Sequence, residues 1–154
     1  CIVGLGRAGR FHLNAINEIE HCHVKYVVDP GISSRDEVVS NSDFILLQEI
    51  EPVLSDPDVD AVIIATPTQF HFKLICQSLE AGKHVFTEKP LGKTSENIKI
   101  CFDLAQQKGL ALYLGFQRRY DHNFIELKNT IEQIGQVRTI KISSRDNPKP
   151  SLDY

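Results

Sequence analysis

Short apolar runs alternate with longer segments of helical spacing along most of the chain. The runs are nearly continuous in apolar residues, which is typical of parallel strands covered on both faces. Strands are therefore predicted at 1–3, 24–28, 60–67, 83–90 and 110–116, with a final one at 136–145. The run at 44–47 is ambiguous, because it suits a short strand as well as part of a helix.

The segments between the runs predict helices, two of which have clear ends. Helices are expected at 8–20, just before Pro57, at 69–81, at 95–108 and at 121–133. The helix at 69–81 ends at Gly82, and the helix at 95–108 begins at a Thr94 or Ser95 cap and ends at Gly109. Strand–helix alternation of this kind predicts an α/β fold with a doubly wound parallel sheet, the Rossmann fold.

Composition and charge exclude several classes of protein. The chain is 42% hydrophobic and 24% charged with a net charge of −3, which is ordinary for a globular domain and offers no basic field to nucleic acid or an anionic membrane. No apolar run is long enough to span a bilayer. The four cysteines lack the spacing of a metal site or a disulfide framework, so we expect a cytoplasmic protein with no metal and reduced, mostly buried thiols.

The most specific pattern is a glycine-rich turn directly after the first strand. Gly4, Gly6 and Gly9 form a G-x-G-x-x-G pattern before a predicted helix. Such a turn lets the backbone approach a pyrophosphate at a helix N-terminus, although a plain tight turn is the alternative. The residues expected to bind the cofactor here are Gly4, Leu5, Gly6, Arg7, Ala8 and Gly9.

Asp29 bears on the choice between NAD and NADP. It stands 20 residues beyond Gly9, at the end of the second predicted strand. There its carboxylate can accept hydrogen bonds from the adenosine ribose and repel a 2′-phosphate, which favours NAD. Arg7 argues the other way, since an arginine near the turn can accommodate that phosphate. We expect NAD as the cofactor, with NADP less favoured.

Polar residues also follow the predicted strand at 60–67, where a doubly wound sheet has its ligand crevice. Thr66 and Thr68 can hydrogen-bond a ligand there, or cap the helix that follows. His71 can belong to the site or be an exposed surface histidine. The residues alone leave these alternatives open.

Two later clusters lie at the same edge of the predicted sheet. Lys89 can donate to a substrate hydroxyl, or form a solvated pair with Glu88, and Pro90 can form a cis peptide with it. The segment "GFQRRYDHNF" at 115–124 can hold polyol or phosphate oxygens through its arginines, or be a solvated helix start capped by Asp121.

Four segments together resemble the glucose–fructose oxidoreductase/inositol dehydrogenase (Gfo/Idh/MocA) family, and most of all its inositol dehydrogenases. They are "GLGRAG", "ATPTQFH", "EKPLG" and "GFQRRYD", and they cover essentially the whole chain. The resemblance implies that Lys89 contacts the reacting hydroxyl and assists proton transfer. It implies a nicotinamide site lined by Thr66, Pro67, Thr68, His71, Glu88, Lys89 and Gln117, and a substrate site with Lys89, Arg118, Arg145 and Asp146.

The resemblance also implies an activity and a domain organisation. The activity is NAD-dependent oxidation of a secondary hydroxyl of a cyclic polyol or sugar. Residues 1–118 are expected to form the dinucleotide-binding domain, and 119–154 its last helix and the entry into a second α+β domain. That domain, with the family's Asp-x-x-x-His motif, is expected to lie outside the chain, so we expect no turnover from the chain alone and a homo-oligomer at full length.

Two other functions stay open on the sequence. The first is a non-catalytic NAD(P)-binding sensor or regulatory protein, because a fold does not determine a function. The second is a reductase of the same family that acts on a different diol or carbonyl substrate.

Overall fold

The computed structural model describes residues 1–33, 36–40, 42–131 and 133–143. The chain divides into two compact units, Cys1–Phe116 and Gln117–Tyr154, which are described separately below. The first unit ends two residues before the domain end expected from the sequence.

A six-stranded parallel sheet forms the centre of the first unit. Its strands are β1 (Ile2–Val3), β2 (Tyr26–Val28), β3 (Ile45–Leu47), β4 (Ala61–Ile64), β5 (His84–Thr87) and β6 (Leu112–Leu114). Their order across the sheet is β3-β2-β1-β4-β5-β6, so the chain reverses its direction of winding at β1, which pairs with both β2 and β4. The ambiguous run at 44–47 is a strand because it completes this edge by pairing with β2.

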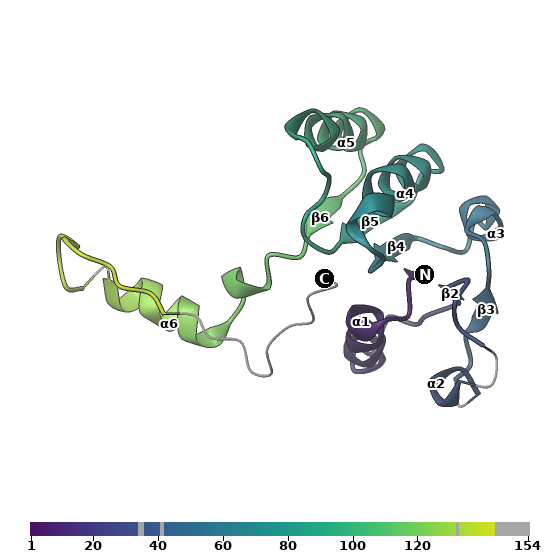
Figure 1. Cartoon of the computed structure of the whole chain (residues 1–154), viewed down its shortest axis with the longest axis horizontal. Coiled ribbons are helices and arrows are strands. Elements are labelled where there is room, and N and C mark those ends of the chain that lie inside the picture. The colour runs from purple at the N-terminus through teal and green to yellow at the C-terminus, as the bar shows by residue number, and fades with distance from the viewer. Residues whose placement is uncertain (34–35, 41, 132, 144–154) are drawn as a thin grey trace. The chain divides into compact units, whose positions relative to one another are not determined.

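Helices cover both faces of the sheet. They are α1 (Arg7–Asn17), α2 (Glu37–Ser40), α3 (Glu51–Ser55), α4 (Thr68–Glu80) and α5 (Ser95–Lys108). Figure 1 shows α1 and α2 on one side of the sheet and α3, α4 and α5 on the other. The predicted doubly wound Rossmann fold is therefore confirmed.

The two faces bury two separate apolar clusters. In β1, Ile2 packs in the cluster that includes Leu13 of α1, whereas Val3 packs in the cluster that includes Ile75 and Leu79 of α4. Successive side chains of a strand point to opposite faces, so even a strand of two residues contributes to both clusters.

The ends of α5 agree with the sequence, whereas the start of α4 does not. Thr94 Oγ1 accepts a hydrogen bond from the backbone N–H of Asn97 at 3.2 Å, and Gly109 closes α5 with a φ of +66°. The expected cap of α4 by Thr66 or Thr68 is wrong. The helix begins one residue early, at Thr68 itself, so its N-cap position falls to Pro67, which has no side-chain acceptor.

The second unit contains the 3₁₀ turn η1 (Gln117–Arg119) and the helix α6 (His122–Ile131). The strand predicted at 136–145 is wrong for its described part, because residues 136–143 form no strand. A strand requires a neighbour to satisfy its backbone groups, and the described residues of this unit provide none. Residues 144 and 145 lie outside the described part of the chain.

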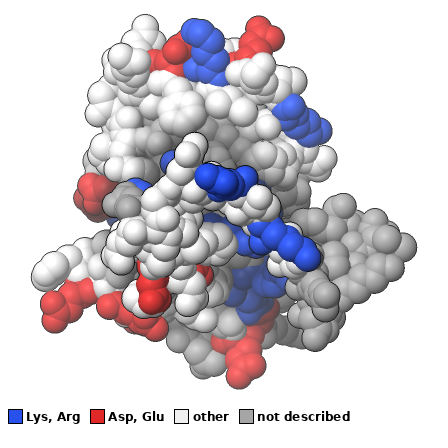
Figure 2. Space-filling model, turned by 90° about the vertical axis from the view of Figure 1, so that its left-hand side faces the viewer, with Lys and Arg blue, Asp and Glu red and all other residues white. Residues whose placement is uncertain are grey.

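Lys and Arg side chains occur together with Asp and Glu side chains on the face shown in Figure 2. None of the helices that the structure describes is long and apolar enough to cross a membrane.

The four cysteines are free thiols, but only Cys101 is buried and Cys22 is exposed, so the expectation of mostly buried thiols is wrong. Burial raises the pKa of Cys101 to about 12, which keeps this thiol protonated.

Candidate functional site

A cavity of about 420 Å³ opens where the carboxyl ends of β1, β2 and β4 meet. This is the point at which the winding of the sheet reverses, the usual ligand site of an open α/β sheet. The predicted site residues among those that line it are Gly4, Gly6, Asp29, Thr66 and Pro67.

The three glycines of the turn have three different reasons to lack a side chain. Gly4 has a φ of +92°, and a Cβ there would lie 2.8 Å from the carbonyl oxygen of Ala65. A Cβ on Gly9 would lie 1.9 Å from the carbonyl oxygen of Gly4, so Gly9 lets α1 pack against the turn. A Cβ on Gly6 would meet nothing within 4 Å, which leaves open space at the start of α1.

The N-terminus of α1 is free to receive an anion. Gly6 occupies the N-cap position without a side-chain cap, and the first turn holds no acidic residue. The helix therefore presents unpaired backbone N–H groups and the positive end of its dipole to the space beside Gly6. Arg7 is exposed at this end of the helix, and Ala8 is half-buried.

Asp29 is held in place by the backbone of two loops. Its Oδ2 accepts the N–H of Leu5 at 2.7 Å, and its Oδ1 accepts the N–H of Gly31 at 2.8 Å. Each oxygen keeps a lone pair for a further donor, such as a ribose hydroxyl. Leu5 itself is fully buried and its N–H is used by Asp29, so this residue shapes the turn through its packing.

His71 joins the loop after β4 to the loop after β5. Its side chain is 1% exposed, so the alternative of a surface histidine is wrong. Nδ1 lies 2.7 Å from the carbonyl oxygen of Pro90, and Nε2 lies 2.7 Å from the carbonyl oxygen of Thr66. The Oγ1 of Thr66 is also buried, and it has no hydrogen-bond partner in the described part of the chain. That hydroxyl is available to a bound ligand.

Lys89 is exposed in the loop that follows β5. The Lys89–Pro90 peptide is cis, as the sequence suggested. Glu88 does not form the surface pair with Lys89, because its Oε1 lies 2.9 Å from Nε2 of His12 on α1. The Lys89 side chain is exposed and makes no hydrogen bond or ion pair with another described residue, which leaves its amine available.

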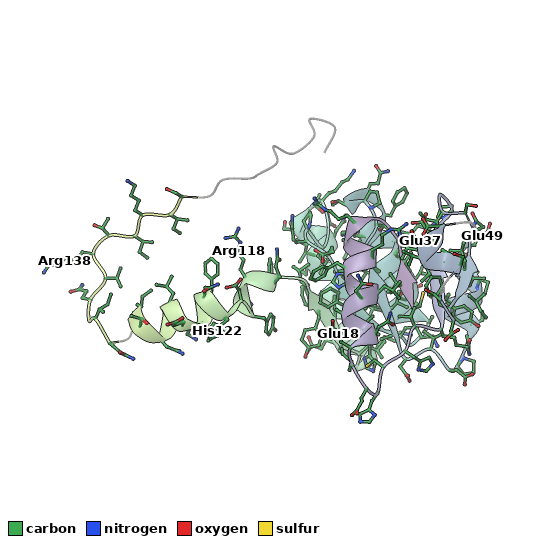
Figure 3. All side chains as sticks on the ribbon, turned by 90° about the horizontal axis from the view of Figure 1, so that it is seen from below. Glu18, Glu37, Glu49, Arg118, His122 and Arg138 are labelled. Carbon is green, nitrogen blue, oxygen red and sulfur yellow. The ribbon has the colours of Figure 1, made fainter. Side chains whose placement is uncertain are left out.

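The remaining predicted residues lie in the second unit or outside the described chain. Gln117 and Arg118 are exposed in η1, and the Arg118 guanidinium lies 5.5 Å from the centre of the Phe124 ring. Figure 3 labels Arg118 and shows the side chains of α6 projecting from the helix. Asp121 Oδ1 accepts the N–H of Asn123 at 2.9 Å, so the helix-capping interpretation holds there. Arg145 and Asp146 lie outside the described residues.

Sequence reasoning missed several residues at the site. Gln48, Phe70 and Lys73 line the cavity, and each lies just after a strand or in the first two turns of α4. Position relative to the strand ends could have identified them. His12 could not be found in this way, because its partner Glu88 is 76 residues away in the chain. The described residues contain no group of His, Cys, Asp or Glu that could hold a metal ion.

The residues present fit a dinucleotide. The open space at Gly6 and the free N–H groups of α1 suit a pyrophosphate, and the oriented carboxylate of Asp29 suits a ribose. The cavity between these loops is lined in part by apolar residues such as Val28 and Leu74, which suits a base.

Comparison with protein families gives the same result. The model of the Gfo/Idh/MocA oxidoreductase family, described as an NAD-binding Rossmann fold, matches residues 1–116.

Individual relatives are about one-third identical to the chain. Inositol 2-dehydrogenase from Rhizobium meliloti is 31% identical over 99% of this chain and 47% of its own. The scyllo-inositol 2-dehydrogenase (NAD(+)) from Bacillus subtilis is 34% identical over 99% of this chain and 46% of its own. The chain thus spans about half the length of the curated relatives it matches.

A solved structure agrees with these relatives. The scyllo-inositol dehydrogenase from Lactobacillus casei, with bound NAD(H) and scyllo-inositol, superposes with a TM-score of 0.78 at 32% identity. The match covers 86% of this chain and 40% of that enzyme.

Proposed function

The chain belongs to the Gfo/Idh/MocA oxidoreductase family and contains its NAD-binding Rossmann domain, and from this premise we propose an activity for the whole protein. The protein oxidises a secondary hydroxyl of a cyclic polyol or sugar, with hydride transfer to NAD⁺. The observation that carries the proposal is the likeness to enzymes named as inositol dehydrogenases over 99% of the chain.

Lys89 is the proposed catalytic residue of this domain. Bound NAD⁺ supplies the nicotinamide ring that accepts the hydride. The exposed Lys89 amine hydrogen-bonds the substrate hydroxyl oxygen and stabilises the negative charge that develops as the hydroxyl proton passes to a general base of the whole protein and the carbinol hydride passes to NAD⁺. His12 holds Glu88 away from Lys89, so the lysine is not neutralised by its neighbour.

The other proposed roles follow the family resemblance. The nicotinamide side is proposed to be lined by Thr66, Pro67, Thr68, His71, Glu88 and Gln117. Arg118, Arg145 and Asp146 are proposed to orient the substrate. The hydroxyl of Thr66 supports the first set, because it is buried without a partner in the described structure and gains one when a ligand binds.

The direct test uses the whole protein with NAD⁺ and a panel of inositol isomers and aldoses, followed by NADH absorbance. We expect NADH to form with at least one cyclic polyol. If the protein binds NAD⁺ but forms no NADH with any member of the panel, the proposed activity is wrong. A non-catalytic NAD-binding sensor would then be the better account.

A further inference from the structure

An ion pair lies one helical turn beyond the glycine turn that Asp29 holds, because the Arg10 N–H donates to the Gly6 carbonyl and the Leu5 N–H donates to Asp29. Arg10 Nη2, on α1, donates to Asp36 Oδ2 at 2.6 Å. The two side chains are 35% and 24% exposed, so the pair is partly shielded from water. Asp36 is oriented from its other side as well, because its Oδ1 accepts the N–H of Val38 at 3.0 Å. The pair thus ties α1 to Asp36, the residue directly before α2.

The charge of Arg10 interacts with both Asp36 and Asp29. The hydrogen bond from Arg10 lowers the pKa of Asp36. The pKa of Arg10 is raised mainly by its hydrogen bond to Asp36, and the charge of Asp29 raises it further. We call these three residues the Asp29 cluster. It holds two carboxylates and one guanidinium, so it carries one negative charge in excess at the end of β2.

We propose that Asp36 is a second determinant of the choice between NAD and NADP, because it holds Arg10 in an ion pair and so withholds it from a 2′-phosphate. Asp29 repels that phosphate directly, and Asp36 occupies the arginine that would otherwise bind it. The inference rests on the dinucleotide site and not on the proposed polyol substrate, so binding alone tests it.

This arrangement also reassigns a role suggested by the sequence. Arg7 was the arginine expected to compete for a 2′-phosphate, but the structure gives Arg7 no interaction with Asp29. Arg10 is instead the arginine whose pKa the charge of Asp29 raises. A guanidinium binds phosphate well through its fork of N–H donors, provided that no carboxylate already occupies the fork.

The two acidic residues are therefore expected to act together. Replacing Asp29 alone removes one repulsive charge but leaves Arg10 bound to Asp36. Replacing Asp36 alone frees Arg10 but leaves the repulsion of Asp29. Only the double replacement does both, so its effect on NADP⁺ affinity should exceed the product of the two single effects.

The experiment measures dissociation constants for NAD⁺ and NADP⁺ by calorimetry on the whole protein. The variants are Asp29→Asn, Asp36→Asn, the double variant, and the double variant with Arg10→Ala. A charge-assisted hydrogen bond to phosphate corresponds to roughly 10-fold to 100-fold in affinity, which is the expected extra gain for NADP⁺ in the double variant. Arg10→Ala should abolish that gain.

Two outcomes would overturn the inference. One is a double variant whose gain in NADP⁺ affinity does not exceed the product of the gains in the two single variants. The other is a gain that survives Arg10→Ala. Asp103→Asn is the matched control, because it removes an acidic partner of Lys99 on the exposed face of α5 and should leave both constants unchanged. If the asparagine variants fail to fold, Asp29→Ser and Asp36→Ser test the same expectation.

Discussion

The proposed catalytic role of Lys89 can be tested separately from cofactor binding. Lys89→Ala in the whole protein should lower kcat by about 10²-fold to 10⁴-fold, the range of a general acid–base group. NAD⁺ affinity should stay nearly unchanged, because the dinucleotide contacts argued above lie at the turn and at Asp29. Steady-state kinetics with NAD⁺ and the best polyol measure both quantities.

The matched control for that variant is Lys93→Ala, which removes another exposed lysine of the same loop. It should leave kcat close to that of the unmodified protein. A Lys89→Ala variant that changes KM alone would mean that the lysine only binds substrate.

His71 is expected to matter for stability, because it is a buried polar side chain with two backbone partners. His71→Ala should lower the free energy of unfolding by about 2–5 kcal/mol, since it leaves a cavity and removes the ring that hydrogen-bonds the backbone of the two loops. Urea unfolding followed by circular dichroism measures the change.

An exposed histidine provides the comparison for His71. His21→Ala changes a surface position and should alter the free energy of unfolding by less than about 0.5 kcal/mol. Equal effects of the two substitutions would show that the bonds of His71 to Thr66 and Pro90 contribute nothing measurable.

At the scale of elements, two glycines of the turn between β1 and α1 are expected to have different roles, Gly9 in packing and Gly6 in ligand binding. Gly9→Ala should destabilise the fold by about 1–3 kcal/mol or more, because its Cβ would meet the backbone of Gly4 at 1.9 Å. Gly6→Ala should be tolerated by the fold, because its φ of −69° suits alanine and no atom lies within 4 Å.

The same Gly6→Ala substitution should nevertheless weaken NAD⁺ binding by about 10-fold or more, since its methyl group enters the space assigned to the pyrophosphate. Thermal melting and calorimetry of the two alanine variants check these expectations. Unchanged NAD⁺ affinity in Gly6→Ala would mean that the pyrophosphate does not approach the backbone there.

How far the sequence predicted the elements depended on where each element finds its partners. Five of the six strands could be predicted because each one is an apolar run, whereas the run of β3 stayed ambiguous because it suits a helix as well. The helix α5 could be predicted because its Thr94 cap and its C-terminal Gly109 are local signals. The predicted strand at 136–145 failed because pairing is not local. The threonine cap of α4 failed because an error of one residue in a helix start reassigns the cap position.

The residues of the candidate site also differ in whether the sequence could predict them. The sequence predicted the glycine turn and Asp29 as site residues, because the turn is a local pattern and the acid follows it at the spacing typical of a dinucleotide-binding unit. It did not identify the Arg10–Asp36 pair, which joins residues 26 apart through the fold. Contacts of this kind depend on the packing of α1 beside the loop after β2, which no spacing along the chain encodes.

At the scale of the whole molecule, Asp56 joins three parts of the first unit. Its Oδ2 accepts the Tyr26 hydroxyl of β2 at 2.8 Å and pairs with Lys25 at 2.7 Å. Its backbone carbonyl accepts Nζ of Lys83, a buried lysine just before β5, at 2.6 Å. The residue itself follows α3, so β2, α3 and the start of β5 meet at this position.

This junction predicts a specific dependence of stability on pH. The hydrogen bond from Lys25, assisted by those from the Asp58 N–H and Tyr26, lowers the pKa of Asp56 from 3.8 to about 2. The carboxyl group therefore binds protons more weakly when folded, so its contribution is fully present above its unfolded pKa of 3.8. That contribution is lost as the pH falls from about 4 toward about 2.

Asp56→Asn should accordingly be less stable than the unmodified protein at neutral pH, and the difference should shrink as the pH falls below about 4. Urea midpoints measured at several pH values between neutrality and this range provide the test. A difference that stays constant over the whole range would assign the effect to packing instead of charge. Asp103→Asn again serves as the control, because its exposed pair with Lys99 lies within one helix and joins no separate elements.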